Sequence, residues 1–364
     1  MATPVLVPKS PSTSQMKALA YHTSGSGPGR SEWASVPLPV LLQPEDAIVR
    51  ITTTTICGTD LHILKGDLPV VTDGRILGHE GIGIVEQVGV GVTEFKPGDK
   101  VIISCVTACT KCDFCRRGMP SHCRNGGWIL GYLIDGTQAE HVRIPHADGS
   151  LYHFPKGGDE ETLVMLSDIL PTGFECGVLN GQVKPGDSVA IIGAGPVGQA
   201  VLLTAQFFSP ASIIVIDLDD HRLAMATDHG ATHIINSKAG DAVSRVMELT
   251  GNAGVDVAIE AVGSPVTFDI CQAIVAPGGR LANVGVHGKP VTLHMEKLWD
   301  RNIAITTRLV DTVTLPMLLK VVLSGKLQPG KLVTHRFKLD DIQRAYDTFA
   351  NAARENALKV VLTA

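Results

Sequence analysis

The chain has 364 residues, more than one hydrophobic core usually organises, so we expect two domains. Hydrophobic residues make up 44% of the sequence and charged residues 18%, and the net charge is −5 at pH 7. This composition is typical of globular proteins, and the acidic balance argues against nucleic acid or a membrane surface as a partner. The longest apolar runs, such as 201–203 and 213–216, are far shorter than the roughly 20 residues that span a bilayer.

At the N-terminus, residues 1–15 are rich in Pro, Ser and Thr, and we expect a disordered tail. They lack the basic start and apolar run of a secretory signal, so the cytoplasm is the default compartment. The eight cysteines agree with this location, because five of them fall at metal-ligand spacings and do not spread out as a disulfide framework would.

Three zones follow the tail. Residues 16–171 alternate short Val-, Ile- and Thr-rich runs with turn signals, which predicts antiparallel β structure, with strands at 47–52 and 83–88. Residues 172–312 predict parallel βαβ units, with buried strands at 188–192, 213–217, 255–261 and 281–284. Residues 313–364 predict helices at 315–323 and within 340–353 and a strand at 359–362, and we expect them to return to the first domain. The fold class is therefore α/β.

A glycine-rich segment joins the strand at 188–192 to a helical stretch at 201–208. It contains Gly193, Gly195, Pro196, Val197 and Gly198 in the pattern G-x-G-x-x-G. The glycines permit a tight turn and let the backbone approach a pyrophosphate, while the helix N-terminus offers N–H groups to the phosphates. The segment therefore predicts a dinucleotide site, and a purely structural glycine turn is the alternative.

Asp217 ends the next predicted strand, about twenty residues later. A carboxylate there accepts hydrogen bonds from the adenosine ribose and repels a 2′-phosphate, which favours NAD over NADP. The alternative is that Asp217 only caps the following helix.

Four cysteines, Cys109, Cys112, Cys115 and Cys123, form the pattern C-x2-C-x2-C-x7-C. Four thiolates close a tetrahedral coordination shell, so we expect a structural zinc ion. An iron–sulfur cluster is the alternative, although the ferredoxin run would continue with three residues and Cys-Pro.

A second constellation consists of Cys57-Gly-Thr59-Asp-Leu-His62 followed by Gly78-His79-Glu80-Gly81. With these motifs, the glycine turn and the four cysteines, the chain resembles the zinc-containing medium-chain alcohol dehydrogenases over nearly its whole length. The resemblance implies a GroES-like catalytic domain (residues 16–171, with 313–364 returning to it) and a Rossmann NAD-binding domain (172–312). It also implies a homotetramer or homodimer.

The resemblance further implies a catalytic zinc held by Cys57, His79 and a third ligand. Many family members use a cysteine there, but this chain has Asp168, as in the branch that includes many secondary alcohol dehydrogenases. Cys176 is the alternative, and Glu80 is a conditional fourth ligand. Three protein ligands leave one position open for an alcohol, whose hydroxyl then loses its proton more readily.

By the same resemblance, the alcohol's proton passes through Thr59, the nicotinamide ribose and His62 to solvent, unless His62 is an ordinary surface histidine. Trp128 either lines the substrate pocket or simply packs. The resemblance also assigns further residues to the cofactor, with Arg222 near the adenosine and Lys359 near the pyrophosphate. The remaining residues assigned to it are Thr172, Val262, Val284 and Leu309.

The sequence thus predicts an enzyme with two zinc ions that oxidises a primary or secondary alcohol reversibly with NAD. Dehydrogenases for a polyol, threonine or a formaldehyde adduct share these motifs. A non-catalytic NAD-binding protein and a zinc-ribbon interaction module are alternatives from other classes, but neither would need a second set of zinc ligands and a relay.

Overall fold

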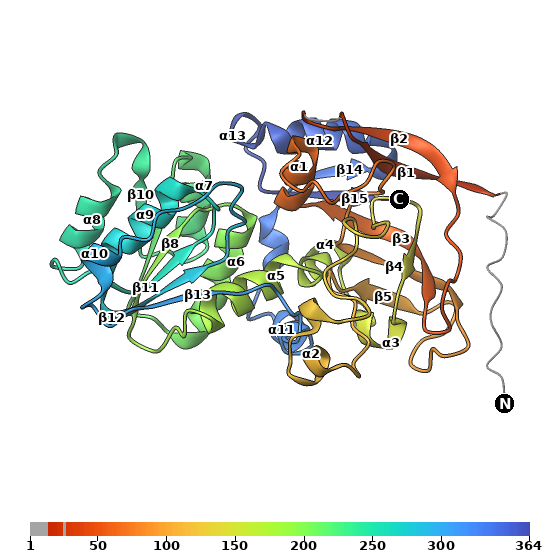
Figure 1. Cartoon of the computed structure of the whole chain (residues 1–364), viewed down its shortest axis with the longest axis horizontal. Coiled ribbons are helices and arrows are strands. Elements are labelled where there is room, and N and C mark those ends of the chain that lie inside the picture. The colour runs from red at the N-terminus through yellow and green to blue at the C-terminus, as the bar shows by residue number, and fades with distance from the viewer. Residues whose placement is uncertain (1–13, 25–26) are drawn as a thin grey trace. The chain divides into compact units, whose positions relative to one another are not determined.

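The computed structural model describes residues 14–24 and 27–364 (Figure 1). Most of the predicted disordered tail, residues 1–13, lies outside the described residues. Gln15, which was assigned to that tail, already belongs to strand β1 (Gln15–His22).

The chain divides into two compact units. The first contains the described residues of Met1–Ser167 together with His335–Ala350 and Lys359–Ala364, and the second contains Asp168–Thr334 and Asn351–Leu358. The division after Ser167 lies four residues before the predicted one. The returning segment is divided as well, because residues 313–334 and 351–358 group with the second unit.

The main sheet of the first unit is built around the long strand β3, which pairs antiparallel with β4, β6 and β15. Its strands run in the order β14-β15-β3-β4-β5-β7 in the described part of the chain, with β6 against β3. The predicted antiparallel structure is therefore confirmed, and the C-terminal strand β15 joins it. A separate antiparallel pair is formed by β1 and β2. The bounds are β2 Arg30–Pro37, β3 Ala47–Ile56, β4 Gly81–Val88, β5 Lys100–Ile103, β6 His141–Ile144, β7 Leu151–His153, β14 Val333–Lys338 and β15 Lys359–Thr363.

Two large apolar clusters, beside a smaller one that contains Met16 and Ile76, lie among the described residues of the first unit. One lies within the sheet region and includes Val49, Val85 and Val101, which alternate along their strands as a half-buried sheet requires. The other packs helices α1 and α12 against β15 through Ile63, Phe349 and Val360 among others. The helices of this unit are α1 Gly58–Lys65, α2 Asp113–Arg116, α3 Ala147–Ser150, α4 Glu160–Leu163 and α12 Ile342–Ala350.

The second unit contains a parallel sheet with the strand order β10-β9-β8-β11-β12-β13 among the described residues. In chain order this is 3-2-1-4-5-6, the order of a doubly wound dinucleotide fold. Its central strands are continuous apolar runs, as expected for strands that are buried on both faces. The strands are β8 Ser188–Ile192, β9 Ser212–Asp217, β10 His233–Asn236, β11 Val255–Glu260, β12 Val275–Asn283 and β13 Ala304–Thr307.

Helices surround this sheet (Figure 1). α11 has the predicted bounds, and the helix after the glycine turn is α6, which continues as a 3₁₀ turn to Phe208. A π-helical segment, Gly173–Leu179, follows α5. The helices are α5 Ile169–Thr172, α6 Pro196–Ala205, α7 Asp220–Asp228, α8 Ala242–Leu249, α9 Pro265–Ile274, α10 Met295–Leu298, α11 Leu315–Leu323 and α13 Ala352–Glu355.

Within residues 14–24 and 27–364, no single helix has the length and apolar composition to cross a membrane. A bent pair, Glu160–Leu166 with Ile169–Leu179, passes that test only when the two helices are taken together across a 42° bend.

Candidate functional site

The side chains of Cys57, His79, Glu80 and Asp168 come together at one point. In the sequence they lie in two separate motifs and a later segment. Cys57, His79, Glu80 and Asp168 each offer a ligand atom, and these atoms all lie within 4.8 Å of one another. The group is enclosed, since Cys57 is 9% exposed and the other three are still more buried. A thiolate, an imidazole and a carboxylate are the ligand types of catalytic zinc, so the donor set fits this ion.

Local structure explains how the ligands meet. Strand β3 ends at Ile56, and Cys57 is the N-cap of α1, where its backbone N–H donates to Asp60 Oδ2 at 2.9 Å. His79 and Glu80 lie directly before strand β4. Gly78, which precedes them, has φ +93°, and a Cβ atom there would come within 2.6 Å of the Gln138 side chain. The close approach of these two segments therefore requires glycine.

The position of Asp168 is fixed by the residue before it. The Ser167 carbonyl accepts the backbone N–H of Cys105 at 3.0 Å, and its hydroxyl lies 3.2 Å from the backbone N of Gly81. Ser167 thus ties the start of α5 to the strand that follows His79 and Glu80. Asp168 Oδ1 also accepts the hydroxyl of Thr172 at 2.7 Å. Cys176, the alternative ligand, is not part of the group that could hold a metal.

Asp60, which sequence reasoning missed, lies behind the ligand His79. Its Oδ1 atom is 3.9 Å from His79 Nδ1, and its Oδ2 atom accepts Gln138 Nε2 at 2.9 Å. The carboxylate is 1% exposed. At 3.9 Å this is an electrostatic contact and not a hydrogen bond, and it places a buried carboxylate beside the His79 ring. The only signal in the sequence is an acid between Thr59 and His62.

The structure gives Lys359 a different partner from the predicted one. Its side chain is 1% exposed, and Nζ donates to Glu80 Oε1 at 2.6 Å and to the Ile56 carbonyl at 3.3 Å. Lys359 therefore lies beside Glu80 of the ligand group and is buried from solvent. The reason is register: Val360 pairs with Ile56, which places Lys359 next to the end of β3.

Three further predicted residues lie near this group. Thr59 Oγ1 is 3.8 Å from Cys57 Sγ, and His62 lies one turn further along α1. The His62 ring contacts Asp67, with 2.7 Å between Nδ1 and Oδ2. Trp128 is half-buried and meets the ring of His79 edge-on, with 5.6 Å between the centroids. A tryptophan against a ligand histidine fits a pocket wall, and it also packs against Tyr132.

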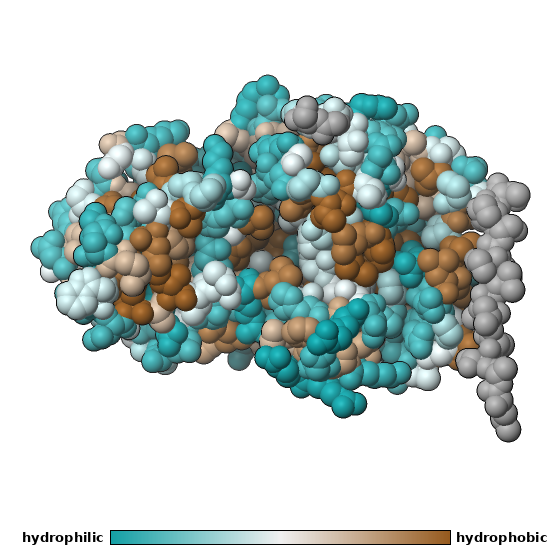
Figure 2. Space-filling model, viewed as in Figure 1, coloured by the Kyte–Doolittle hydropathy of each residue, from teal (hydrophilic) through white to brown (hydrophobic). Residues whose placement is uncertain are grey.

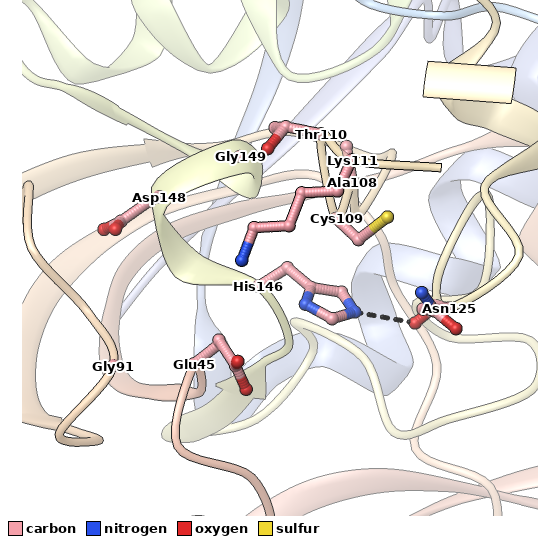
Figure 3. Close-up of a pocket in the computed structure, with 10 residues that line it drawn as sticks. All are labelled: Glu45, Gly91, Ala108, Cys109, Thr110, Lys111, Asn125, His146, Asp148 and Gly149. Atoms are coloured by element: carbon pink, nitrogen blue, oxygen red, sulfur yellow. Dashed lines mark hydrogen bonds between the residues drawn. The ribbon is translucent and has the colours of Figure 1, made fainter. Parts of the chain in front are cut away.

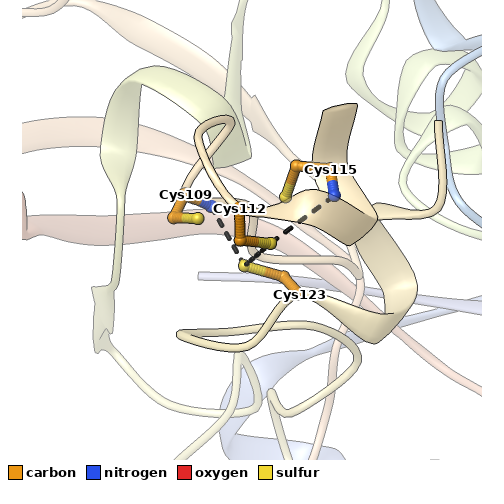
Figure 4. A group of neighbouring side chains, drawn as sticks. All are labelled: Cys109, Cys112, Cys115 and Cys123. Carbon is orange, nitrogen blue, oxygen red and sulfur yellow. Dashed lines mark hydrogen bonds between the residues drawn. The ribbon is translucent and has the colours of Figure 1, made fainter. Parts of the chain in front are cut away.

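The four cysteines in and around α2 point their sulfur atoms toward one another (Figure 4). All four sulfur atoms lie within 4.8 Å of one another, and those of Cys112 and Cys123 are 4.0 Å apart. Sulfur atoms bound to one tetrahedral zinc at about 2.3 Å stand roughly 3.8 Å apart. A four-iron cluster, in which each thiolate binds its own iron, would hold them farther apart, so the geometry fits zinc.

Hydrogen bonds already favour thiolate at part of this site. The backbone N–H of Cys115 points to Cys112 Sγ and, with that of Arg124, lowers the pKa of Cys112 to about 6. Burial instead raises the pKa of Cys123 and of Cys115. A bound cation would bring all four sulfurs to the charged form, because metal binding releases thiol protons.

A pocket of about 240 Å³ lies beside this loop in the first unit (Figure 3). His146 projects into it and contacts the Asn125 carbonyl at 2.9 Å, and Asp148 accepts the backbone N–H groups of Thr93 and Glu94. Because these polar groups hold neighbouring loops, we assign no ligand to the pocket.

In the second unit the glycine turn has the geometry of a phosphate cradle. Gly193 has φ +106°, and a Cβ atom on Gly198 would lie 1.8 Å from the Gly193 carbonyl, so both positions require glycine. At Gly195 the space is open, and the nearest atom to a Cβ there would be Arg222 Nη1 at 3.9 Å. Helix α6 begins with Pro196 and Val197 at this turn. Arg222 thus lies beside the open side of the turn at which α6 begins.

Asp217 is bound to the same turn. Its Oδ2 atom accepts the backbone N–H of Ala194 at 2.6 Å, and Oδ1 accepts those of Leu218 and Asp219. The N-cap of α7 is Asp219, whose side chain accepts the N–H of Arg222. The helix-cap alternative for Asp217 is therefore wrong, although its carboxylate does organise the backbone before the helix.

Of the other predicted cofactor residues, Thr172 ends helix α5, and the rest follow strand ends or lie on loops of this unit. Val262 is 46% exposed and Leu309 41%, while Val284 and Thr172 are half-buried. Val262 lies beside the glycine turn, because a Cβ atom on Gly193 would come within 2.6 Å of Val262 Cγ2.

Two buried acids that sequence reasoning missed hold the loops that carry these residues. Glu260, at the end of β11, accepts the N–H groups of Val262 and Gly263. Glu175 accepts those of Asp311, Thr312 and Thr314. Both side chains are 0% exposed. No motif in the sequence distinguished them from surface acids.

Comparisons with known proteins agree with this geometry. Residues 43–156 match the family model described as "Alcohol dehydrogenase GroES-like domain", and residues 196–322 match "Zinc-binding dehydrogenase". The solved structure "Zinc dependent alcohol dehydrogenase 2 from Streptococcus pneumonia - apo form" is similar, with a TM-score of 0.91 and 56% identity, over 96% of this chain and 98% of that one. An alcohol dehydrogenase of Cupriavidus necator is 38% identical over 96% of this chain and 99% of that protein. The NADP-dependent isopropanol dehydrogenase of Thermoanaerobacter brockii is 33% identical over 88% of this chain and 94% of that protein.

Proposed function

The chain belongs to the zinc-containing medium-chain alcohol dehydrogenase family, and we propose that it reversibly oxidises primary or secondary alcohols to aldehydes or ketones with NAD. It is an oxidoreductase that uses zinc and a pyridine nucleotide. The observation that carries the proposal is the convergence of Cys57, His79, Glu80 and Asp168 within 4.8 Å.

Cys57, His79 and Asp168 are proposed to hold the catalytic zinc, which supplies Lewis-acid polarisation of the alcohol oxygen when bound. Three protein ligands leave one coordination position for the substrate. Glu80 is the fourth donor of the group, and the contact of Lys359 with its carboxylate holds it in place. Asp60 orients His79, and Trp128 forms part of the substrate wall.

Thr59 and His62 are proposed to carry the alcohol's proton away from the site. They lie three residues apart on α1, so their side chains project from the same face of the helix. Thr59 is next to Cys57, whereas the His62 side chain is 30% exposed. Thr59 is half-buried, and a proton accepted there can leave by way of the nicotinamide ribose and a histidine that reaches water.

A second zinc at Cys109, Cys112, Cys115 and Cys123 is proposed to be structural, because four thiolates leave no coordination position for a substrate. The α2 helix within this loop contributes no buried residue to the core. The loop therefore depends on its cysteines for a fixed conformation.

NAD is proposed as the cofactor because Asp217 places a carboxylate at the end of β9, beside the turn that would receive the pyrophosphate. The proposed contacts are those of the glycine turn, Arg222, Thr172, Val262, Val284 and Leu309. NADP is the second candidate, since the half-buried Arg222 beside Gly195 supplies a cation and a relative is NADP-dependent.

The protein is further proposed to be a cytoplasmic homodimer or homotetramer. All eight cysteines are free thiols, which suits a reducing compartment. In the second unit, β13 is the last strand of the sheet, and apolar side chains (brown) gather near α9 and α10 on the face shown in Figure 2. Val266, Met295 and Trp299 are 68%, 52% and 74% exposed. An open strand edge with exposed apolar side chains suits association with a second copy.

The decisive experiment is a panel of primary, secondary and aromatic alcohols, with a polyol, threonine and formaldehyde–thiol adducts, each assayed with NAD and with NADP. Zinc is determined on the same preparation. The proposal expects two zinc ions per chain and the highest kcat/KM with a simple alcohol and NAD. One zinc per chain without turnover would instead indicate a non-catalytic binding protein, and preference for another substrate class would reassign the enzyme within its family.

A further inference from the structure

We propose that Asp67 is a positioning residue that fixes the imidazole of His62 for proton release. The inference rests on the proposed function, because His62 has this task only if the chain oxidises an alcohol and must return its proton to water. Asp67 belongs to none of the motifs that the sequence offered. Its place is decided by how α1 ends.

Helix α1 ends in a left-handed cap that turns the chain back toward His62. Gly66 has φ +84°, its N–H donates to the Ile63 carbonyl at 3.0 Å, and the N–H of Asp67 donates to the His62 carbonyl at 3.0 Å. This is the Schellman arrangement, in which the residue after the cap returns over the last turn of the helix. The backbone therefore holds residues 62 and 67 together independently of their side chains.

The side chains then meet in a short, directed contact. His62 Nδ1 and Asp67 Oδ2 are 2.7 Å apart, and the two side chains are 30% and 38% exposed. An ionised carboxylate only accepts hydrogen bonds, so the proton of neutral His62 belongs on Nδ1. Nε2 then carries the lone pair, and the ring cannot rotate without breaking the contact.

Proton release follows from this tautomer. Nε2 accepts the proton that Thr59 passes on through the nicotinamide ribose, and the ring becomes an imidazolium with Nδ1–H still donated to Asp67. Nε2 next gives the same proton to water and returns to its starting state. Asp67 stays ionised throughout and neither gains nor loses a proton. Its contribution is to hold the imidazole in the orientation in which Nε2 can accept and release the proton.

The first unit offers a matched control. His22 and Asp73 form another histidine–aspartate contact, 3.5 Å between Nδ1 and Oδ1, with side chains 27% and 63% exposed. Asp73 is also fixed by the backbone, since Oδ1 accepts the N–H of Thr23 at 2.9 Å. The variant Asp73→Ala therefore removes the same chemical group from a comparable pair that has no place in the relay.

The test compares Asp67→Ala, Asp67→Asn, His62→Ala, the Asp67→Ala/His62→Ala double variant and Asp73→Ala in the zinc-loaded enzyme. First-turnover rates come from the absorbance of the reduced cofactor in stopped-flow experiments, with and without added imidazole. KM for the alcohol, zinc content and thermal stability are measured on each protein.

We expect Asp67→Ala to slow the first turnover about 10-fold, which is less than the roughly 10²–10⁴-fold of a complete general base because His62 itself remains, with KM and zinc content unchanged. Asp67→Asn should stay within about twofold, because the amide oxygen still accepts from Nδ1. Added imidazole should restore both Asp67→Ala and His62→Ala. In the His62→Ala background, loss of Asp67 should cost nothing more.

Other results would overturn the inference in distinguishable ways. A normal rate in Asp67→Ala with a slow His62→Ala would leave the relay intact and remove Asp67 from it. Equal losses from Asp67→Ala in both backgrounds, or from Asp73→Ala, would indicate a structural effect. A normal rate in His62→Ala would remove the relay itself. Absence of alcohol oxidation by the wild-type enzyme would contradict the proposed function.

Discussion

The Nζ atom of Lys359 lies 2.6 Å from Oε1 of Glu80, and each side chain is only 1% exposed. A cation from the last strand of the chain is thus buried beside a carboxylate of the proposed catalytic zinc site. Burial of one such charge without the other is costly. The C-terminal strand therefore belongs to the construction of the site as well as to the sheet.

Replacing Lys359 with methionine should destabilise the first unit strongly. Removing one partner of a buried pair typically costs about 3–5 kcal/mol, because the other charge stays buried. The free energy of unfolding, measured by urea titration, tests this. The control is Arg354→Met, which breaks an exposed pair with Glu355 and should cost below about 1 kcal/mol. A Lys359→Met effect no larger than this control would contradict the prediction, and adding Glu80→Gln to Lys359→Met should recover part of the loss.

Asp168 is the residue that tests the proposed zinc ligands most directly. Asp168→Ala should reduce zinc from two ions per chain to one and lower turnover by roughly 10³-fold or more, since Lewis-acid polarisation contributes several kcal/mol. Cofactor binding, followed by fluorescence titration, should be largely retained. Cys176→Ala is the control, because this buried thiol lies outside the ligand group, and it should keep both zinc ions. Loss of one zinc ion from Cys176→Ala would indicate that Cys176, and not Asp168, is the third zinc ligand.

The four-cysteine loop should lose its fixed conformation when one ligand is removed. Cys112→Ser is expected to release one zinc ion and to unfold the backbone around the already exposed Lys111, Arg116, Arg117 and Arg124 so that trypsin can cleave there, because α2 has no buried residue to hold it. Cleavage should become at least about tenfold faster, as measured by gel electrophoresis and mass spectrometry. Cys271→Ala removes a buried thiol of the second unit and should leave the cleavage rate unchanged. Full zinc content in Cys112→Ser would argue against the proposed site.

Cofactor choice can be tested at Asp217 with the smallest change of side-chain shape. Asp217→Asn keeps one oxygen that can accept backbone N–H groups, turns the other acceptor into a donor, and removes the charge that repels a 2′-phosphate. The ratio of kcat/KM for NAD to that for NADP should fall about tenfold, a change of 1.4 kcal/mol. Asp219→Asn removes an equal charge two residues away, and asparagine still caps α7. If both variants changed the ratio equally, the overall negative potential near the end of β9 would determine cofactor choice, and Asp217 would have no specific role.

Much of the fold could be predicted because local patterns record it. Strand β8 and helix α11 have the predicted bounds. Each was recognised from residues close together in the sequence: β8 from an apolar run before a glycine turn, and α11 from an amphipathic pattern. The division of the last segment could not be predicted. Amphipathic helices α11 and α12 both need an apolar partner, but nothing in their own residues says that they group with different units.

The sequence by itself determined the chemical inventory: four cysteines at zinc spacing, a glycine turn after a strand, and Cys57, His79 and Asp168 as expected ligands. These groups are recognisable because metal and phosphate chemistry require particular residue types at short spacings. Only the tertiary structure decided the partners of the acids and of Lys359. Asp60 faces His79, Asp67 holds His62 and Lys359 is buried against Glu80. The cap at the end of α1 brings Asp67 back to His62. The register of β15 against β3 brings Lys359 to Glu80, although the two residues are 279 positions apart in the chain.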